Sequence, residues 1–489
     1  MTIKFYNTYN RKVENFTPLK KGYVGIYCCG LTVYDYAHIG NFRAYIFEDI
    51  LRRVLDFNNL KVEHIQNITD VGHLTSDADS GEDKIEKAAK KEHKSAWEIS
   101  SYYTKTFKDD MKKLNILSPN VWCKATEHIQ EQVDLINELE KKGFTYQTKD
   151  GIYFDTSKSK DYGKLARLNV KGIKAGIRVE LGDKKNPTDF ALWKFSPRSD
   201  SGQAKRQMEW SSPWGIGFPG WHIECSAMSM KYLGEQFDIH CGGVDHIGVH
   251  HTNEIAQSQA VTGKIPAKFW MHNEILFVND EKMSKSKNNF YTLRDLEKKG
   301  YSPLAFRYLL LMSHYRETMN FTWDSLHAAQ KGLANIYGFL YNMFLEDRGN
   351  GTKDHPNFKK YLKDKKTEFL EIINDDLNTP QALAIMFEVM HDTNEMLYTK
   401  GLSKNNICDL EKLFINLDRI FGLKFEQYLE KGKKEVVPDE VKKMVTNRVG
   451  LREVGKYREA DVLRDKIEKL GYHVEDSPNG PVIKRTKVL

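Results

Sequence analysis

Five of the sixteen histidines of this chain fall between residues 222 and 251, a density that indicates a metal site. Thiols and carboxylates are interleaved with them, at Cys225, Cys241, Asp245 and Glu254. Thiolate sulfur, imidazole nitrogen and carboxylate oxygen together form a donor set that suits Zn²⁺. The pattern therefore predicts a zinc site built largely from this part of the chain.

The helical period helps to choose among these donors. If residues 250–261 form a helix, His250 and Glu254 stand four positions apart on one face. His251 would instead share its face with the apolar Ile255. We therefore select His250 over His251 as the ligand.

Other cysteines are placed less clearly by pattern. Trp221 and Cys225 are four residues apart, so an aromatic face and a thiolate can border one pocket if this segment is helical. Cys28 and Cys29 are adjacent near the end of an expected strand, and neighbours in an extended chain point to opposite sides. At most one of the two serves a given site, and the pattern alone does not decide which.

Two further segments carry groups suited to phosphate. His38, Gly40 and Asn41 lie where a loop passes into an expected helix, and the N–H groups and dipole of a helix start favour an anion. Far downstream, Lys282 and Lys285 make a cationic loop that can neutralise charge on transferring phosphates. Each segment alone is weak evidence, because Asn41 can be an ordinary helix cap and a Lys/Ser stretch an ordinary surface loop.

The expected elements place these groups at one edge of a parallel sheet. Residues 24–29 and 62–69 read as strands joined by a helix over 42–57, which makes a βαβ unit. Residues 220–233 predict a helix and 237–240 a further strand. Since parallel sheets bind ligands at the carboxyl ends of their strands, we expect the site there.

Two regions depart from this alternation. Between 123 and 204, hairpin signals such as Asp150-Gly151 and polar stretches indicate an insertion that splits the nucleotide-type fold. From residue 327 the pattern is almost continuously helical and predicts a helix bundle. Residues 439–489 form a final piece with a helical face of its own.

The composition is that of an ordinary globular protein, with 489 residues, 40% of them hydrophobic and 29% charged. The six cysteines lack the spacing of a disulfide framework. No run of 18 apolar residues and no secretory signal is visible, so we expect a cytoplasmic protein without a membrane span. The net charge of +7 permits a nucleic-acid partner without requiring one.

Taken in order, the blocks YCCGLTVYD, HIGN, NITD, GWHIECSAM, FDIHCGGVD, HHTNEIAQS and KMSK resemble those of the cysteinyl-tRNA synthetase family, within the class I aminoacyl-tRNA synthetases. The resemblance runs over essentially the whole chain. It implies an α/β fold, in which a Rossmann-like catalytic domain is split by an insertion and followed by an all-α helix bundle and a small C-terminal domain. The implied segments are 1–122 and 205–263 for the catalytic halves, 123–204 for the insertion, 264–326 for a connecting segment with the KMSKS loop, 327–435 for the helix bundle and 436–489 for the C-terminal domain.

The resemblance also implies roles for single residues. One zinc ion per chain would be held by Cys29, Cys225, His250 and Glu254, which leaves Cys28 as a small buried apolar residue. The cysteine pocket would contain Thr69, Trp221, His240 and Asp245. ATP, with Mg²⁺, would be bound by His38, Gly40, Asn41 and Lys285, and catalysis would be supported by His38, Lys282 and Lys285.

The implied activity is ligation of L-cysteine to tRNA(Cys) through a cysteinyl-adenylate, by a protein that we expect to be a monomer. One rival is a ligase that passes the same adenylate to a small amine; the helical part after residue 327 argues against it. Another is a zinc-dependent RNA-binding protein with an inactive core; the presence of His38, Lys282 and Lys285 argues against it. The chain departs from the family at Asn41, where the motif usually has histidine, and over residues 71–90, to which we assign no role.

Overall fold

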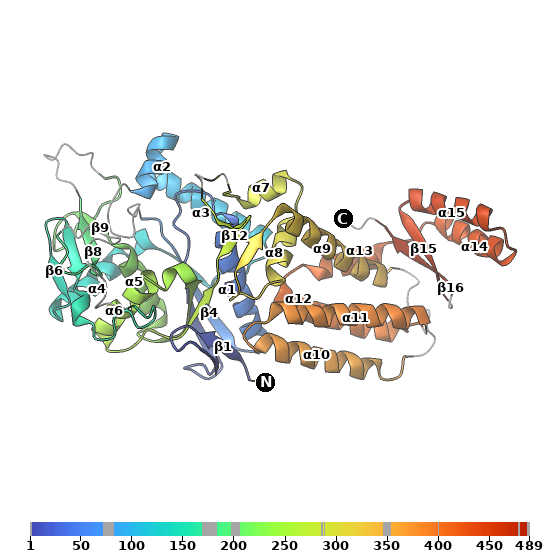
Figure 1. The fold of residues 1–489 in the computed structure, drawn as a ribbon, viewed down its shortest axis with the longest axis horizontal. Coiled ribbons are helices and arrows are strands. Elements are labelled where there is room, and N and C mark those ends of the chain that lie inside the picture. Colours follow the sequence, from blue (N-terminus) through green and yellow to red (C-terminus); the bar gives the residue numbers. More distant parts are fainter. Residues whose placement is uncertain are drawn as a thin grey trace. The chain divides into compact units, whose positions relative to one another are not determined.

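The computed structural model describes residues 2–71, 83–168, 183–196, 206–284, 287, 289–345, 354–399, 401–477 and 480–486. These residues form two compact units. The N-terminal unit comprises residues 2–295 together with 315–320, and the C-terminal unit comprises residues 296–314 together with 321–489. The expected α/β part followed by a helical part is confirmed (Figure 1).

A five-stranded parallel sheet in the order β11-β10-β3-β4-β5 is the centre of the N-terminal unit. Its strands are β3 (Tyr23–Cys28), β4 (Lys61–Ile68), β5 (Val121–Lys124), β10 (Phe237–Gly243) and β11 (Ala267–Asn273). From β3 the chain first builds the sheet outward through β4 and β5, and later adds β10 and β11 on the other side. This reversal of direction makes the carboxyl ends of β3 and β10 the place where such sheets bind ligands.

Helix α1 (Ile39–Phe57) connects β3 to β4 and packs against the sheet. Its buried residues Phe42, Ile46, Ile50 and Val54 recur every four positions, which gives the helix one apolar side. The helix begins with a capping box: His38 Nδ1 accepts a hydrogen bond from the Asn41 N–H, and Asn41 Oδ1 accepts one from the His38 N–H. Reciprocal bonding of this kind fixes where the helix starts.

Helices cover both faces of the parallel sheet. The Sγ atom of Cys28, at the end of β3, lies within 4.8 Å of a carboxylate oxygen of Glu48 of α1, whereas the next residue, Cys29, lies beside Cys225 of α5 (Trp221–Leu233). Successive residues of extended chain point to opposite faces, so α1 and α5 lie on opposite sides. Helices α2 (Lys84–Glu92), α3 (Ala96–Lys113) and α6 (His250–Thr262) also belong to this unit.

An antiparallel sheet in the order β6-β7-β8-β9 interrupts the alternation of strands and helices. Its strands are β6 (Thr145–Gln147), β7 (Gly151–Phe154), β8 (Phe190–Phe195) and β9 (Gly217–Pro219). The turn at residues 148–150 joins β6 to β7, as the Asp-Gly signal predicts. Helix α4 (Ile129–Lys141) packs on this sheet through Ile136 and Leu139. The sheet continues to residue 219 and so extends past position 204.

Two smaller sheets complete the N-terminal unit. Strands β1 (Lys4–Asn7) and β2 (Lys12–Asn15) form a hairpin. Strands β12 (Leu276–Val278), β13 (Glu281–Lys282) and β14 (Met319–Phe321) form a sheet in the order β13-β12-β14. The KMSKS segment therefore begins in β13, and α7 (Leu293–Lys298) comes after it in the chain.

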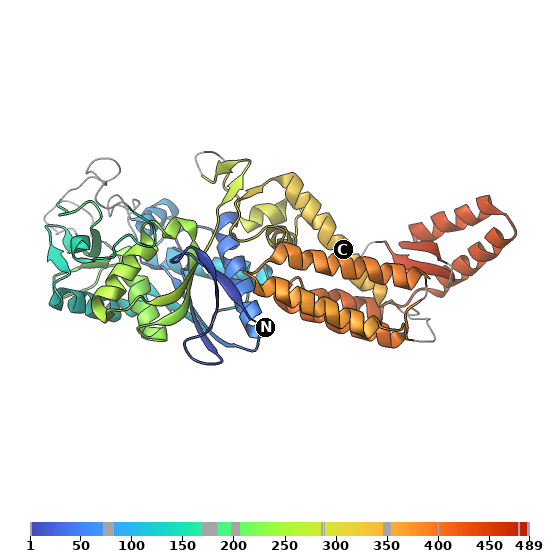
Figure 2. The same ribbon diagram turned by 60° about the horizontal axis from the view of Figure 1, so that its bottom comes forward.

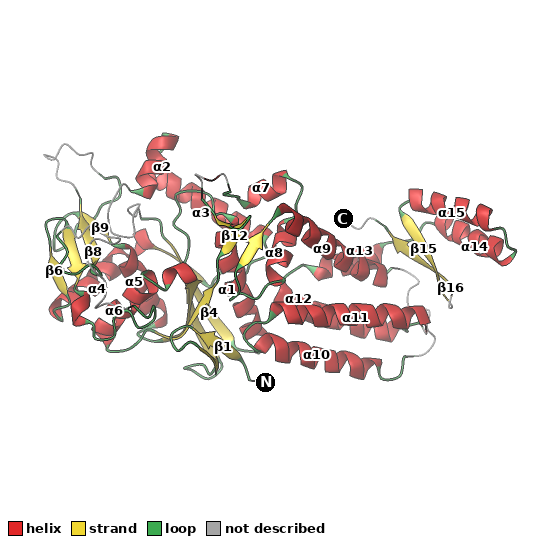
Figure 3. Ribbon diagram, viewed as in Figure 1, coloured by secondary structure: helices red, strands yellow, loops and turns green. Residues whose placement is uncertain are grey.

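Helices dominate the C-terminal unit (Figures 2 and 3). They are α8 (Pro303–Leu311), α9 (Trp323–Met343), α10 (Phe358–Asn374), α11 (Thr379–Thr399), α12 (Lys404–Phe421), α13 (Phe425–Lys434), α14 (Asp439–Glu453) and α15 (Tyr457–Lys469). The chain then forms a hairpin of β15 (Tyr472–Ser477) and β16 (Gly480–Arg485). Together with α14 and α15, this hairpin has a small core of its own that includes Val441, Ile467 and Val474. Among the described residues, no helix is long and apolar enough to cross a membrane.

Gly30 is required where the ends of β3 and β4 come together. A Cβ atom at this position would lie 1.6 Å from the backbone carbonyl oxygen of Asn67. We therefore expect Gly30→Ala to lower the free energy of unfolding by about 1–3 kcal/mol or more, the cost of overpacking a site that cannot relax. Urea denaturation measures this change. Gly243→Ala is the matched control, because a Cβ there would meet no atom within 4 Å, and equal losses in both variants would contradict the steric explanation.

Candidate functional site

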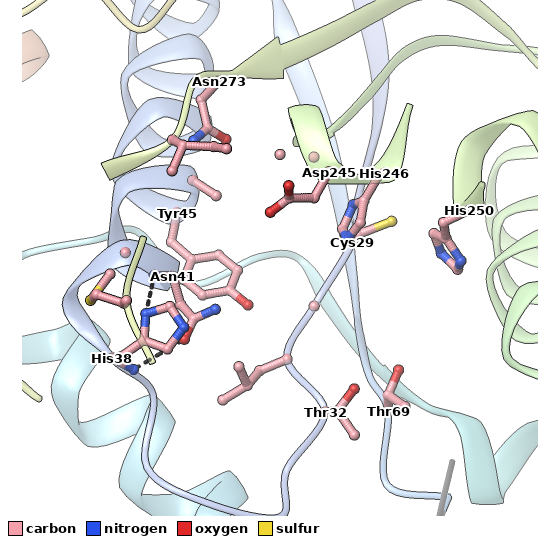
Figure 4. A pocket seen from close by; sticks show the side chains of 18 of the residues that line it. Cys29, Thr32, His38, Asn41, Tyr45, Thr69, Asp245, His246, His250 and Asn273 are labelled. Atoms are coloured by element: carbon pink, nitrogen blue, oxygen red, sulfur yellow. Dashed lines mark hydrogen bonds between the residues drawn. The ribbon is translucent and has the colours of Figure 1, made fainter. Parts of the chain in front are cut away.

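A cavity of about 360 Å³ lies at the carboxyl ends of β3, β4 and β10 (Figure 4). It is lined by separate parts of the chain, namely residues 29–45, 67–69, 84, 221–225, 242–250, 273–283 and 290. Because these parts are far apart in the sequence, the order of strands in the parallel sheet is responsible for bringing them together. The cavity thus occupies the position at which sheets of this topology bind ligands.

Four metal-binding side chains converge at one side of the cavity. The donor atoms of Cys29, Cys225, His250 and Glu254 all lie within 4.8 Å of one another, and all four residues are buried. His250 Nε2 is 3.1 Å from Glu254 Oε1, so the two residues do share a face of α6. Cys29, Cys225 and His250 also line the cavity, so an ion bound here would be within reach of a ligand in it.

Further polar contacts hold these donors in place. His222 and His250 exchange a hydrogen bond between their Nδ1 atoms over 2.9 Å, and the His250 ring stacks on Trp221 at 4.4 Å between centroids. His240 Nε2 lies 2.9 Å from Glu254 Oε2. Ligating histidines and carboxylates characteristically have such partners. The sequence predicts His240 in the wall of the substrate pocket; in the structure it is fully buried, contacts Glu254 and is not among the residues that line the cavity.

A second set of donors overlaps the first. Cys29, His240, His251 and Glu254 also lie within 4.8 Å of one another, and His251 Nε2 is 3.3 Å from Cys29 Sγ. The other ring nitrogen of His251 contacts His272 Nε2 at 2.8 Å. His250 lines the cavity and His251 does not, so only the first set presents its histidine to a ligand.

Burial controls the protonation of the two thiols. It raises the pKa of Cys29 well above its ordinary value. A hydrogen bond with Cys29 lowers the pKa of Cys225, but burial together with the nearby carboxylates of Glu254 and Glu224 outweighs this bond and leaves the pKa raised. Both thiols are therefore protonated near pH 7 when no cation is bound. A metal ion binds to them by displacing these protons.

The two segments expected to bind phosphate lie beside one another. The Ile39 N–H donates a hydrogen bond to the Tyr291 carbonyl oxygen over 2.9 Å, which connects the start of α1 to the chain just after the KMSKS segment. A Cβ atom on Gly40 would lie 2.3 Å from Met283 Cε, so the two segments are in close contact. His38, Gly40 and Asn41 line the cavity together with Lys282 and Met283.

Lys282, the first lysine of the KMSKS segment, reaches across to Asp245. Lys282 Nζ lies 3.4 Å from Asp245 Oδ1, and both side chains are exposed. An exposed ion pair contributes little stability, so this pair can open when a ligand binds. Asp245 thus lies at the cavity, where the substrate ammonium is expected. Lys285 lies outside the described residues.

Thr69 and Trp221, both expected in the cysteine pocket, line the cavity. Thr69 Oγ1 donates a hydrogen bond to Glu224 Oε2 over 3.2 Å and accepts one from Asn67 over 3.0 Å. These bonds fix the hydroxyl of Thr69 at the end of β4, so the cavity wall here has a defined shape.

Sequence reasoning missed three polar residues of the site, namely His222, Glu224 and His246. His246 lines the cavity, and burial lowers its pKa to about 4, so its ring is neutral near pH 7. The spacing could have indicated His222, because it lies three residues before Cys225 on α5. No local pattern marks Glu224 or His246, whose surroundings come from distant parts of the chain.

Known proteins are similar in sequence to this chain over nearly its whole length. Residues 15–331 match a family model described as tRNA synthetases class I (C) catalytic domain, and residues 368–426 match a DALR domain. Cysteine-tRNA ligase 1 of Burkholderia lata is 46% identical over 483 residues, which cover 98% of this chain and 96% of that protein. Cysteine-tRNA ligase of Treponema denticola is 42% identical over 496 residues, 97% of this chain and 98% of that protein.

Solved structures with a similar fold have much lower identity. Methionyl-tRNA synthetase of Mycobacterium tuberculosis, in complex with methionyl-adenylate, has a TM-score of 0.56 and 13% identity, and the match covers 84% of this chain and 92% of that one. The structure titled as an arginyl-tRNA synthetase of Campylobacter jejuni has a TM-score of 0.53 and 14% identity, covering 84% and 93%. These matches support the fold.

The buried carboxyl of Asp70, just past β4, should make the free energy of unfolding depend on pH. Burial raises its pKa to about 6 although it accepts two hydrogen bonds from Thr126. The folded state then binds a proton that the unfolded state has lost, so this group's contribution to stability falls as pH rises from about 4 to 6 and is level above that. Relative to Asp70→Asn, the wild type should lose roughly 1–3 kcal/mol of unfolding free energy over this range. Chemical denaturation at a series of pH values checks this, and parallel profiles for the two proteins would contradict it.

Proposed function

Because the chain belongs to the cysteine-tRNA ligase family of class I aminoacyl-tRNA synthetases, we propose that its cavity is where cysteine is activated. ATP and L-cysteine give cysteinyl-adenylate and pyrophosphate, and a ribose hydroxyl at the end of tRNA then takes the cysteinyl group. The observation that carries the proposal is the buried set of Cys29, Cys225, His250 and Glu254 beside the cavity.

A zinc ion would be held by these four residues. The set fits the ion chemically, because two thiolates, an imidazole and a carboxylate are donors that Zn²⁺ prefers. When bound, zinc supplies a soft Lewis acid that favours the substrate thiolate over the hydroxyl of serine. His222 and His240, hydrogen-bonded to His250 and Glu254, would orient two of the ligands.

Binding of ATP is assigned to the start of α1 and the KMSKS segment. His38, Gly40 and Asn41 surround a helix start, whose dipole and N–H groups favour the phosphates of ATP with its Mg²⁺. Lys282 and Lys285 would balance charge that develops on the phosphates as pyrophosphate leaves.

No side chain has to act as a nucleophile in this reaction. The carboxylate of cysteine is already ionised near pH 7 and attacks the α-phosphate directly, so the enzyme acts by positioning and by stabilising charge. Asp245 would bind the substrate ammonium, and Thr69 and Trp221 would form the walls around the substrate.

The later part of the chain is assigned to tRNA. The DALR match at 368–426 lies within the helices expected to bind tRNA, and the small domain at 436–489 would add further contacts. The other assignments are 1–122 and 205–263 to the catalytic domain, 123–204 to the insertion, 264–326 to the connecting segment and 327–435 to the helix bundle. The enzyme would act as a monomer in the cytoplasm, where charged tRNA is used. A ligase for a small amine is not favoured, because the cysteine-tRNA ligases match residues far beyond the activation site.

Amino-acid dependence of pyrophosphate exchange tests the activity. A pocket that separated cysteine from serine by packing alone would gain only about 1–3 kcal/mol, or up to roughly 200-fold. With a metal-selected thiolate, we expect exchange with cysteine to exceed exchange with serine by more than about 200-fold. Comparable rates for the two amino acids in metal-loaded enzyme would contradict the proposed selection.

Metal content of variants tests the ligand set. Cys29→Ala, Cys225→Ala and His250→Ala should each contain one zinc ion fewer than the wild type, because each removes a donor from the centre. His251→Ala is the matched control, since it removes a neighbouring buried imidazole that does not line the cavity. Elemental analysis of the purified proteins gives the counts. Loss of zinc from His251→Ala together with retention in His250→Ala would mean that the overlapping set is the occupied one.

Truncation tests the role of the small domain. A chain that lacks residues 439–489 should keep cysteine-dependent exchange, because every candidate for the chemistry lies earlier in the sequence. Its efficiency in charging tRNA should fall, and the affinity of the full-length protein for tRNA should weaken as salt rises. Both assays use the same folded preparation. Undiminished charging by the truncated chain would remove the role assigned to this domain.

A further inference from the structure

A second cluster of metal-binding side chains lies on the face of the parallel sheet that α1 covers. Cys28 ends β3, His64 belongs to β4 and Glu48 comes from α1. Their donor atoms all lie within 4.8 Å of one another, and the three residues are at most 3% exposed. The cluster shares no residue with the centre beside the cavity, because Cys28 and Cys29 point to opposite faces of the sheet.

The cluster contains polar atoms that lack partners. Among the described residues, neither ring nitrogen of His64 has a hydrogen-bond partner, although the ring is almost fully buried. Gln66, opposite Cys28 in the strand register, donates to Glu48 Oε2 over 3.1 Å, while its own Oε1 accepts no bond from the described residues. Buried polar groups are nearly always paired, so an imidazole with two bare nitrogens indicates a missing ligand.

The donors of this cluster suit zinc. Burial lowers the pKa of His64 to about 3, so the ring is neutral near pH 7 and offers a lone pair. A thiolate and a carboxylate supply two negative charges, which balance a divalent cation in a buried place. Sulfur combined with nitrogen and oxygen favours Zn²⁺ over Mg²⁺ or Ca²⁺. Cys241 is opposite Cys28 in the register of β10 and β3, so it is a further buried thiol on this face of the sheet.

We propose that Cys28, Glu48 and His64 bind a second zinc ion, separate from the one assigned to cysteine selection. None of the three lines the cavity and all three are buried, so an ion here would not contact a ligand in the cavity and would have a structural role. The ion ties α1 to β3 and β4. Since α1 begins at the HIGN motif, this connection holds the helix start that faces ATP at a fixed place on the sheet. The site goes beyond the proposed function, which needs only one ion.

Zinc content of the full-length protein, expressed with zinc in the medium, tests the proposal. We expect two zinc ions per wild-type chain and one in His64→Phe, which keeps a ring but removes both nitrogens. Cys123→Ala is the matched control, because Cys123 is a buried thiol of β5 in the same sheet and belongs to neither donor set; it should keep two ions. A single ion in the wild type, or two ions in a folded His64→Phe, would overturn the proposal.

Cobalt substitution gives a reading that does not depend on whether His64→Phe folds. In the Co²⁺-substituted wild type, the near-ultraviolet charge-transfer band grows with the number of cobalt–thiolate bonds. Cys29 and Cys225 alone account for two such bonds, and a second site adds at least one more. If the band of the wild type exceeds the intensity of two cobalt–thiolate bonds and Cys28→Ser loses the excess, the site is supported. If the wild-type band has the intensity of two bonds and Cys28→Ser leaves it unchanged, the proposal is overturned. Cysteine-dependent exchange by the same wild-type preparation tests the proposed function separately.

Discussion

The parallel pairing of β3 with β10 is the constraint on which the site depends. Its register sets Ile26 against Ile239 and Cys28 against Cys241, so it joins the first part of the fold to the part beyond the inserted sheet. The Cys29 N–H donates to the Cys241 carbonyl oxygen over 3.2 Å, which continues the alignment one residue past β3. A slip by one residue would exchange the two faces and turn Cys28 toward α5 and α6. Backbone register therefore decides which thiol meets which histidines.

Pairing among buried side chains then gives the donors their orientation. Burying a polar group costs free energy unless it is hydrogen-bonded, and four of the imidazoles near the cavity are hydrogen-bonded in two pairs. His222 contacts His250, and His251 contacts His272, whose Nδ1 contacts Thr8. These contacts hold the rings in place before any ion binds, so the protein supplies the geometry in advance. Within the described part of the sheet, His64 differs from these rings because neither of its nitrogens is hydrogen-bonded, whereas His240 leaves only Nδ1 unpaired.

Features that depend on the spacing of apolar and polar residues within one helix or strand were predicted well from the sequence. The βαβ unit, helices α5 and α6 and the face shared by His250 and Glu254 all come from spacings of two or four residues. The contacts of His240 with Glu254 and with Trp270, at 4.7 Å between ring centroids, could not be predicted, because they depend on how distant parts of the chain pack. The contact of Glu224 could not be predicted either, because its partner Thr69 is distant in the sequence. Cys28 was expected to be only a small buried apolar residue of the core.

The capping box at the start of α1 has a consequence for the direction of hydrogen bonds in the cavity. His38 Nδ1 accepts from the Asn41 N–H, so the proton of the neutral ring must sit on Nε2. Amide side chains do not titrate in water, so Asn41 Oδ1 accepts the hydrogen bond from the His38 N–H at any ordinary pH. The helix cap thereby selects one tautomer of the imidazole. This ring can donate its Nε2–H to a bound anion, but it presents no free lone pair to that anion. This part of the pocket therefore favours groups that accept hydrogen bonds.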